Sequence, residues 1–248
     1  MSRHRFYAPN ATGCNLSITL PHVEAYQLAR VLRLKRGRTV NVFDGQGREF
    51  VAEIEKIEKK IVTLRTLKAF DAIPEPKVHI TLALSLLKGR LADNVVRDAT
   101  MVGATIIQPL LTTRSQNTYT TSQLNKSIKR WESIAISSSK QCGRAVVPSI
   151  NQVRSLKDFL KLEEPALRII LVEPTTKKKA AGLDILQKSK IPSQATILVG
   201  PEGGWTPREL EEATKQGFHP VTFGSRTLRA DATPIVSISL FQYLWSDL

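Results

Sequence analysis

Residues 1–70 alternate short apolar runs with polar turns. These runs predict β-strands, because apolar and polar side chains that alternate face opposite sides of a sheet. They lie at residues 5–7, 16–20, 39–43, 49–57 and 61–67. Asp44-Gly45-Gln46-Gly47 lies between two of the runs and predicts a hairpin, while apolar positions within 21–34 fit a short helix. Several short strands with one helix predict a small β-barrel.

From residue 78 onward the pattern changes to an alternation of strands and helices. Strands are predicted at 78–86, 105–111 and 195–199, and a strand that ends in a turn at 169–174. Helices are predicted at 92–101, 124–138 and 156–162, and a last helix begins at Thr233-Pro234. This alternation is typical of an α/β fold with a mainly parallel sheet.

Residues 69–77, which include Pro74 and Pro76, separate the two patterns. Proline stiffens a linker and interrupts both helices and strands. We therefore expect a boundary near Ile73, with one domain over residues 1–72 and a second over residues 73–248.

The charge of the chain is strongly positive and uneven. The 248 residues carry a formal net charge of +14 at pH 7, and residues 1–70 hold 13 Lys and Arg against 6 Asp and Glu. Such a basic domain favours a polyanionic partner, above all nucleic acid. The candidate phosphate contacts are Arg3, Arg5, Arg30, Arg33, Lys35, Arg36 and Arg38. Phe6 and Tyr7, beside the first arginines, predict a base-stacking face.

The sequence also argues against a membrane protein and a metalloprotein. The longest apolar stretch, residues 78–87, is too short to span a bilayer, and no signal-peptide pattern opens the chain. We therefore expect a cytoplasmic protein without a membrane partner. The two cysteines, Cys14 and Cys142, lie in no metal-binding or disulfide pattern, so no metal site is expected.

The residues after the apolar run at 195–199 predict a ligand site. Gly200-Pro201-Glu202-Gly203-Gly204 follows the run, and Thr206 and Glu209 then have the spacing of a helix capping box. A glycine loop lets a ligand approach the main chain closely. Open α/β sheets bind ligands at the carboxyl ends of their strands, where this loop is expected. A second loop, residues 223–231, also follows an apolar strand and precedes a helix.

These strings resemble a known family. Residues 198–204, L-V-G-P-E-G-G, and 223–231, F-G-S-R-T-L-R-A-D, are similar to the two late motifs of the RsmE family of ribosomal RNA methyltransferases, members of the SPOUT class. Leu87-Lys88-Gly89 and Gln141-Cys142-Gly143-Arg144 resemble two further strings of that family. Residues 31–47 resemble its PUA-like barrel, so the likeness covers nearly the whole chain.

The resemblance implies an α/β architecture in which a small PUA-like RNA-binding β-barrel precedes a SPOUT domain with a trefoil knot and a mainly parallel sheet. It implies S-adenosylmethionine as the cofactor and a homodimer. The expected cofactor-binding residues are Leu171, Val172, Glu173, Val199, Gly200, Pro201, Glu202, Gly203, Gly204, Phe223, Gly224, Thr227 and Leu228. The expected RNA-binding residues are Arg3, Arg5, Arg33, Arg36, Lys88, Arg144 and Arg226.

The implied reaction is methylation of N3 of a specific uridine in the 16S ribosomal RNA of the small ribosomal subunit. Loss of the N3 proton puts negative charge on the flanking carbonyl oxygens, which a fixed guanidinium can stabilise. Arg229 is the expected catalytic residue, and Arg226 is the second choice, with a structural role in the loop as its alternative. Asp231 is a candidate base, with a structural role as the alternative.

Two other functions stay open. A SPOUT methyltransferase could act on another RNA target, such as uridine C5, where attack usually needs a thiolate and Cys142 is the candidate. The chain also departs from the family pattern: Met101, Ser138-Ser139 and Asp231 stand where the family has Glu, Glu-Ala and Glu. These departures favour a non-catalytic RNA-binding ribosome-assembly factor as the second alternative.

Overall fold

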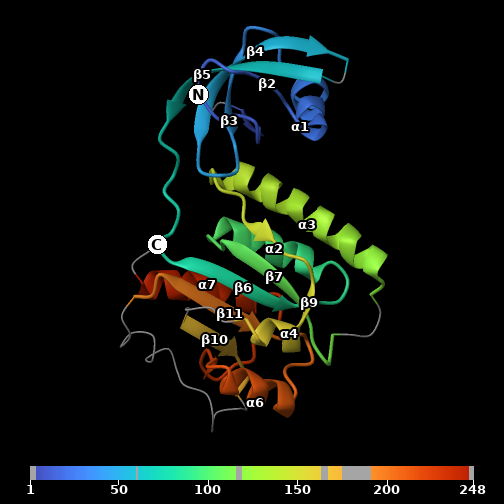
Figure 1. The fold of residues 1–248 in the computed structure, drawn as a ribbon, viewed down its shortest axis with the longest axis vertical. Helices are drawn as coiled ribbons and strands as arrows, with labels where there is room; N and C mark the ends of the chain where they lie inside the picture. Colours follow the sequence, from blue (N-terminus) through green and yellow to red (C-terminus); the bar gives the residue numbers. More distant parts are fainter. Residues whose placement is uncertain (1–3, 60, 116–118, 163–166, 175–190, 246–248) are drawn as a thin grey trace. The chain divides into compact units, whose positions relative to one another are not determined.

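The computed structural model describes residues 4–59, 61–115, 119–162, 167–174 and 191–245 (Figure 1). The chain forms two compact units. The first consists of Met1–Glu75 together with Ile136–Val147, and the second of Pro76–Ala135 together with Pro148–Leu248. A segment from the middle of the chain is thus built into the first unit. The functional division into residues 1–72 and 73–248 stays a prediction.

The first unit is built on a five-stranded sheet. In sheet order the strands are β1 (Arg5–Tyr7), β3 (Thr39–Phe43), β4 (Glu49–Glu58), β5 (Ile61–Phe70) and β2 (Ser17–Thr19). β1 runs parallel to β3, and the other neighbours are antiparallel. The five predicted strands and the β3–β4 hairpin are confirmed, because each strand coincides with an apolar run. Closure of this sheet into a barrel stays a prediction.

One helical segment packs on the sheet of the first unit. It begins as α1 (His22–Tyr26) and continues as the π-helical turn η1 (Gln27–Val31). Leu28 from this segment is fully buried in one apolar cluster with Phe6, Ile54 and Leu64. The predicted helix within residues 21–34 is therefore confirmed, and its buried side completes the core of the unit.

The second unit is an α/β fold around a parallel sheet. Its strands, in sheet order, are β12 (His219–Val221), β10 (Leu167–Leu171), β11 (Gln194–Val199), β6 (His79–Ser85), β7 (Ile106–Leu111) and β8 (Ser149–Ile150), and β9 (Arg154–Ser155) also pairs with β7. Each of these pairs is parallel. The predicted mainly parallel sheet is confirmed. Sequence reasoning misses β8 and β9, because strands of two residues show no periodicity.

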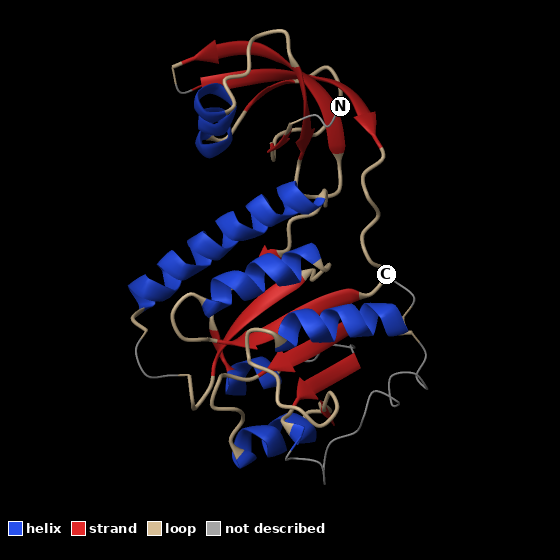
Figure 2. Ribbon diagram, turned by 180° about the vertical axis from the view of Figure 1, so that it is seen from behind, coloured by secondary structure: helices blue, strands red, loops and turns tan. Residues whose placement is uncertain are grey.

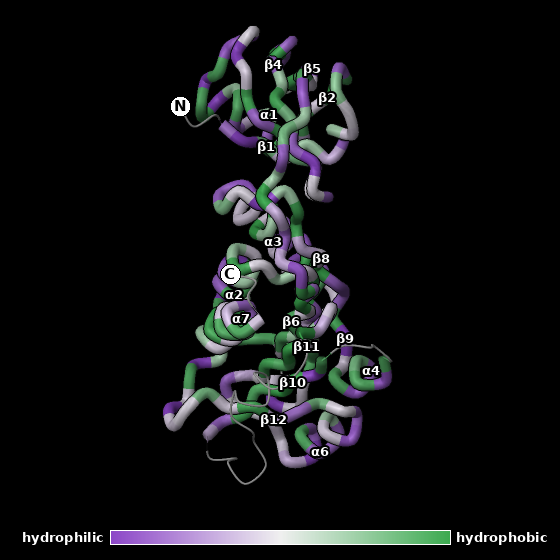
Figure 3. The backbone as a smooth tube through the Cα atoms, turned by 90° about the vertical axis from the view of Figure 1, so that its left-hand side faces the viewer, coloured by the Kyte–Doolittle hydropathy of each residue, from purple (hydrophilic) through white to green (hydrophobic). Residues whose placement is uncertain are grey.

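Helices cover both faces of this sheet (Figure 2; Figure 3). On one face α2 (Leu91–Met101) contacts α7 (Thr233–Leu244), and on the other α4 (Leu156–Leu160) contacts α6 (Pro207–Lys215). α3 (Thr121–Cys142) begins in the second unit and ends in the first. Among the described residues, no helix combines the length and the apolar character that crossing a bilayer requires.

Candidate cofactor site and RNA-binding surface

Three neighbouring strands bring the predicted loops to one edge of the second sheet. β12, β10 and β11 are adjacent and parallel, so their carboxyl ends lie side by side. The segments that follow β10, β11 and β12 are residues 172–174, 200–206 and 222–232. The fold thus gathers segments that are distant in sequence at the edge where open α/β sheets bind ligands.

These segments line a cavity of about 1290 Å³. Small-molecule sites usually occupy about 300–1,000 Å³, so this cavity can hold a cofactor and part of a second ligand. The expected cofactor-binding residues that line it are Leu171, Val172, Glu173, Val199, Gly200, Pro201, Glu202, Gly203, Gly204, Phe223, Thr227 and Leu228. Gly224 is the exception, and its φ of +67° instead gives the loop a turn that favours glycine.

The glycine loop has two positions at which a side chain would collide with a neighbour. A Cβ atom at Gly204 would lie 2.9 Å from Oε1 of Glu173, and the φ of Gly204 is +68°. A Cβ atom at Gly200 would lie 3.1 Å from the Trp205 ring. The φ of Gly204 therefore favours glycine, and a side chain at Gly200 would require the Trp205 ring to shift. Glycine at both positions leaves the main chain of the loop accessible from the cavity.

The predicted capping box at the start of α6 is confirmed. The Thr206 hydroxyl accepts a hydrogen bond from the Glu209 N–H at 3.2 Å, and the Glu209 carboxylate accepts one from the Thr206 N–H at 2.9 Å. The same carboxylate also accepts hydrogen bonds from the Thr206 hydroxyl at 2.9 Å and from the N–H of Thr113 at 2.8 Å. Burial raises the pKa of Glu209, but these hydrogen bonds outweigh burial and hold the pKa below its ordinary value. An ionised Glu209 therefore joins the loop after β7 to the glycine loop.

Sequence reasoning misses several residues of the cavity, among them Trp205 and Arg114. Trp205 donates a hydrogen bond from Nε1 to the carbonyl of Leu171 at 2.9 Å and so joins the glycine loop to the end of β10. Arg114, in the loop after β7, donates to the carbonyl of Gly203. The position of Trp205 directly after two glycines is a usable signal. No local pattern marks Arg114, because its partner is distant in sequence.

Arg229 lines the cavity and forms an ion pair with Asp231. Nε of Arg229 lies 3.0 Å from Oδ1 of Asp231, and Nη2 lies 3.3 Å from Oδ2. The Arg229 side chain nevertheless stays 76% exposed. Asp231 therefore orients the guanidinium while leaving it accessible, a geometry that favours the structural role of Asp231 over the role of base. Arg226 lines the same cavity.

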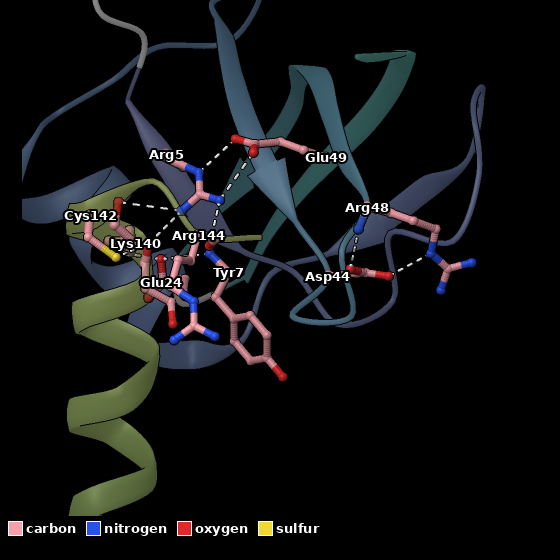
Figure 4. A network of polar contacts seen from close by, with 10 residues as sticks. Arg5, Tyr7, Glu24, Asp44, Arg48, Glu49, Lys140, Cys142 and Arg144 are labelled. Atoms are coloured by element: carbon pink, nitrogen blue, oxygen red, sulfur yellow. Dashed lines mark hydrogen bonds and ion pairs between the residues drawn. The ribbon is translucent and has the colours of Figure 1, made fainter. Parts of the chain in front are cut away.

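Two arginines that were expected to contact RNA are held in ion pairs inside the first unit, and Figure 4 shows the pair of Arg5 with Glu49. Arg5 contacts both carboxylate oxygens of Glu49, with Nε 2.6 Å from Oε1, and donates to the carbonyls of Ser139 and Arg144 at 2.8 Å. The Arg144 side chain is 8% exposed and pairs with Glu75. This geometry gives Arg5 and Arg144 structural roles, because guanidinium groups buried against carboxylates are not available to phosphates.

The base-stacking face predicted at Phe6 and Tyr7 is wrong at Phe6, while Tyr7 is half-buried. Phe6 is fully buried in the core of the first unit. The Tyr7 ring packs against the Phe43 ring, with 5.5 Å between their centroids. Burial and the nearby Asp44 carboxylate both raise the pKa of Tyr7, as expected for a phenol held within the fold.

The other candidate RNA contacts are placed differently. Arg33 and Arg36 border a groove of about 810 Å³ in the first unit, which we call the basic groove and which also includes Arg30 and Lys35. Lys88 is exposed, and its backbone N–H donates to the Glu202 carboxylate at 2.9 Å. Arg3 lies outside the described residues.

Cys142, the candidate thiol for C5 chemistry, lies at the end of α3 within the first unit. It is half-buried, and its Sγ lies 3.8 Å from the carbonyl oxygen of Ser139. No cluster of three or more His, Cys, Asp or Glu that could hold a metal ion occurs in the part of the chain that the structure describes.

Comparison with known proteins identifies the family. Residues 74–242 match the model of the RNA methyltransferase domain, and residues 28–67 match that of the RNA methyltransferase PUA domain. The ribosomal RNA small subunit methyltransferase E of Synechocystis is 32% identical over 225 residues, which cover 90% of this chain and 72% of the relative.

Two solved structures resemble this fold over almost its whole length. The ribosomal RNA small subunit methyltransferase E of Neisseria gonorrhoeae, bound to S-adenosyl methionine, is 30% identical, with a TM-score of 0.87 and coverage of 99% of this chain and 98% of that one. A methyltransferase of Legionella pneumophila in complex with the same cofactor is 27% identical, with a TM-score of 0.89 and coverage of 98% of both chains. The chain therefore belongs to the ribosomal RNA small subunit methyltransferase E family.

Proposed function

We propose that this protein is an S-adenosylmethionine-dependent methyltransferase that modifies N3 of a specific uridine in the 16S ribosomal RNA of the small ribosomal subunit. One observation carries the proposal: three adjacent parallel strands place the glycine loop and the segment 222–232 around a single cavity. Family membership supplies the reaction, and the two similar structures with bound cofactor support the same use of this cavity.

The cavity has the chemical features that S-adenosylmethionine requires. The buried apolar residues Leu171 and Val199, with Phe223, offer walls for the flat adenine ring. The exposed main chain of the glycine loop offers hydrogen bonds for the polar edges of the cofactor. We therefore assign cofactor binding to the predicted residues that line this cavity. When bound, the cofactor supplies a methyl group on a positively charged sulfonium centre.

The residues of the chain contribute mainly position and charge. Uridine N3 is a poor nucleophile while protonated, and loss of its proton moves negative charge onto O2 and O4. We assign the stabilisation of that charge to Arg229, whose guanidinium is exposed at the cavity and oriented by Asp231. A preorganised guanidinium costs little reorganisation during the reaction, so its effect falls mainly on the transition state.

For the finer fold we propose a trefoil knot in the second unit and a closed PUA-like barrel in the first. The strand order supports the knot, because the last strand, β12, pairs with β10 and not with the preceding β11. This crossover places the segment 222–232 beside the segments that follow β10 and β11. The match to a PUA domain model over residues 28–67 supports the barrel. We also propose that residues 1–72 form the RNA-binding domain and that residues 73–248 form the methyltransferase domain.

The first unit supplies the RNA-binding surface in this proposal, through Arg33 and Arg36 at the basic groove. We also propose a cytoplasmic homodimer, as expected for the family. Ile238, Phe241 and Trp245 of the last helical segment are buried within their own unit, so they cannot form the dimer surface. Tyr243, which is 72% exposed on α7, remains as a candidate contact.

Two measurements test the proposed function. Isothermal titration calorimetry should detect binding of S-adenosylmethionine to the purified protein. Mass spectrometry of ribosomal RNA should show one N3-methyluridine that disappears when the gene is deleted and returns when native small subunits are incubated with the protein and cofactor. A deletion strain that keeps every N3-methyluridine would overturn the proposed reaction. RNA binding without cofactor binding would instead support an assembly factor.

A further inference from the structure

The helical segment of the first unit exposes an apolar face that the fold does not cover. Val23, Tyr26 and Val31 are 74%, 59% and 62% exposed, whereas Ala25 and Leu28 on the opposite side are buried. Val23 and Tyr26 lie one α-helical turn apart. Val31 follows Tyr26 by one turn of η1, in which residues five apart are bonded, as the 2.9 Å hydrogen bond from the Leu32 N–H to the Gln27 carbonyl shows. The three side chains therefore share one face.

Tyr26 stands out on this face because its ring is available for stacking. Among the described residues the close aromatic pairs are Tyr7–Phe43, Phe223–Phe241 and Phe241–Trp245, and none involves Tyr26. An exposed, unstacked aromatic ring on a basic protein can stack on a nucleobase.

The surroundings of this face are strongly cationic. Residues 22–38 contain five Lys and Arg and a single carboxylate, Glu24. Glu24 is buried, and it pairs with Lys140 at 2.8 Å, so it does not offset the exposed cations. Two carboxylates that border the basic groove, Glu55 and Glu58, have cationic partners in Arg65 and Lys56. The charge is complementary to a polyanion and unfavourable for a basic or apolar protein partner.

Arg33, at the end of this segment, is a charged residue at a strained backbone position. Its φ is +50°, in the left-handed region where helices usually end in glycine. The N–H of Leu34 then bonds to the carbonyl of Leu28 at 3.1 Å, which fixes the turn. A long cationic residue there costs conformational energy that glycine would not, and such strain often marks a functional position.

We infer that this face, made of Val23, Tyr26 and Val31 with the cations Arg30 and Arg33, binds an unpaired nucleotide of the RNA substrate. The Tyr26 ring stacks on the base, and Arg30 and Arg33 contact the flanking phosphates. An unpaired nucleotide is required, because bases stacked inside an A-form helix do not present their faces to a side chain. The inference rests on the proposed function and adds which surface of the first unit holds the RNA and in what state.

The first test separates stacking from charge. Binding of a fluorescein-labelled single-stranded RNA of mixed sequence, and of the same strand annealed to its complement, is measured by fluorescence anisotropy over a range of salt concentrations. Tyr26→Ala should weaken binding of the single strand by on the order of 10-fold, with an unchanged salt slope, and should affect the duplex much less. Tyr26→Phe keeps the ring and should bind like the wild type. Equal affinity of the Ala and Phe variants for the single strand would overturn the inference.

The second test uses the strain at Arg33. Arg33→Gly should raise the melting temperature by about 2–4 °C, because glycine relaxes the backbone, and should still weaken RNA binding and lower the salt slope by roughly 0.7. Lys59→Gly is the matched control, because Lys59 is also an exposed cation at positive φ, 42°, but lies in the β4–β5 turn. The Lys59→Gly variant should also have a raised melting temperature, but it should bind RNA with the affinity of the wild type. Equal RNA affinities of the two variants would remove Arg33 from the surface.

Failure of this inference can be told apart from failure of the proposed function. Calorimetry with S-adenosylmethionine on the same Tyr26→Ala protein should give the wild-type affinity. If the wild type binds the cofactor and methylates native small subunits while Tyr26→Ala binds RNA normally, only the surface assigned here is wrong. If the wild type neither binds the cofactor nor methylates, the proposed function fails by itself.

Discussion

Arginines play opposite roles in the cavity of the second unit and in the polar network of the first unit. The network consists of Arg5, Glu49, Glu24, Lys140 and Arg144. At the cavity, Arg229 has one carboxylate partner and keeps 76% of its side chain exposed. In the network, Arg5 donates to Glu49 and to three main-chain carbonyls, and its side chain is 12% exposed. The number of partners within the fold, and not the local charge of the sequence, decides whether an arginine can reach a ligand.

The network has a structural function of its own. Arg5 donates to the carbonyls of Ser139 and Lys140 in the last turn of α3. The Ser139 carbonyl also accepts a hydrogen bond from the N–H of Gly143 at 3.1 Å. A cation at that end also interacts favourably with the helix dipole. Lys140 in turn bonds to Glu24 at 2.8 Å and to Gln27 at 2.5 Å. These contacts fasten the segment 136–147 into the first unit.

Among the substitutions that test this comparison, we expect the largest effect at Arg5, on the free energy of unfolding. Arg5→Ala leaves Glu49 as a buried carboxylate without its cation, so the free energy of unfolding should fall by about 3–5 kcal/mol. Arg65→Ala removes an arginine that is 60% exposed and paired with Glu55, and should cost less than about 1 kcal/mol. Urea denaturation of both variants measures the difference. Similar costs for the two would show that Arg5 has no special structural role.

At Arg229 we expect a loss of activity and little change in stability, the opposite of Arg5. Arg229→Ala should lower the methylation turnover by about 10²- to 10³-fold, because a preorganised donor acts on the transition state, while the affinity for S-adenosylmethionine and the melting temperature change little. Arg208→Ala is the control, since Arg208 is 87% exposed and pairs with Glu212 on α6. Single-turnover kinetics on native small subunits measures the effect. Near-normal turnover of Arg229→Ala would exclude Arg229 from the mechanism.

Glu209 extends the comparison to an ionised carboxylate that is buried beside the glycine loop. Glu209→Gln removes the charge but keeps the shape, so stability at pH 7 should fall by about 0.5–1.5 kcal/mol. Because the folded pKa of Glu209 lies below its ordinary value of 4.5, the wild type has this advantage above about pH 5 and loses it as the pH falls through the folded pKa.

Urea denaturation at several pH values measures the difference between wild type and Glu209→Gln. The control is Glu212→Gln on the same helix, whose carboxylate pairs with Arg208 and is 40% exposed, and whose effect should stay within about 0.5 kcal/mol. A difference in unfolding free energy between the wild type and Glu209→Gln that persists unchanged at low pH would contradict a stabilising role of the ionised Glu209 carboxylate.

The smallest effect concerns an apolar contact. Leu228 lines the cavity and Leu67 lies in the first unit, and both are 37% exposed. Leu228→Ala should weaken binding of S-adenosylmethionine about 5-fold, for roughly 40 Å² of lost apolar contact, and Leu67→Ala should leave it unchanged. Isothermal titration calorimetry measures the affinity of both variants for S-adenosylmethionine. Equal affinities would place the cofactor away from the segment 222–232.

The sequence is a good guide where the interacting residues are close in the chain. The capping box of Thr206 and Glu209 and the hairpin between β3 and β4 follow from residues a few positions apart, and the structure has both. The expected cofactor-binding residues of the glycine loop share one cavity because they are consecutive in sequence. Arg114 and Trp205 are missed because their partners, Gly203 and Leu171, lie 89 and 34 positions away along the chain.

By itself, then, the sequence determined the longer strands, the helices, the family and the loops that form the cavity, because periodicity, capping and turn chemistry act over short distances. Only the tertiary structure decided which arginines are available to a ligand. Arg5 and Arg33 look alike in a basic stretch of sequence, yet Arg5 is buried against Glu49 and the end of α3, and Arg33 stays exposed at the basic groove. The difference arises because burial and ion pairing depend on segments that folding brings together, such as residues 136–147, and no local pattern records them.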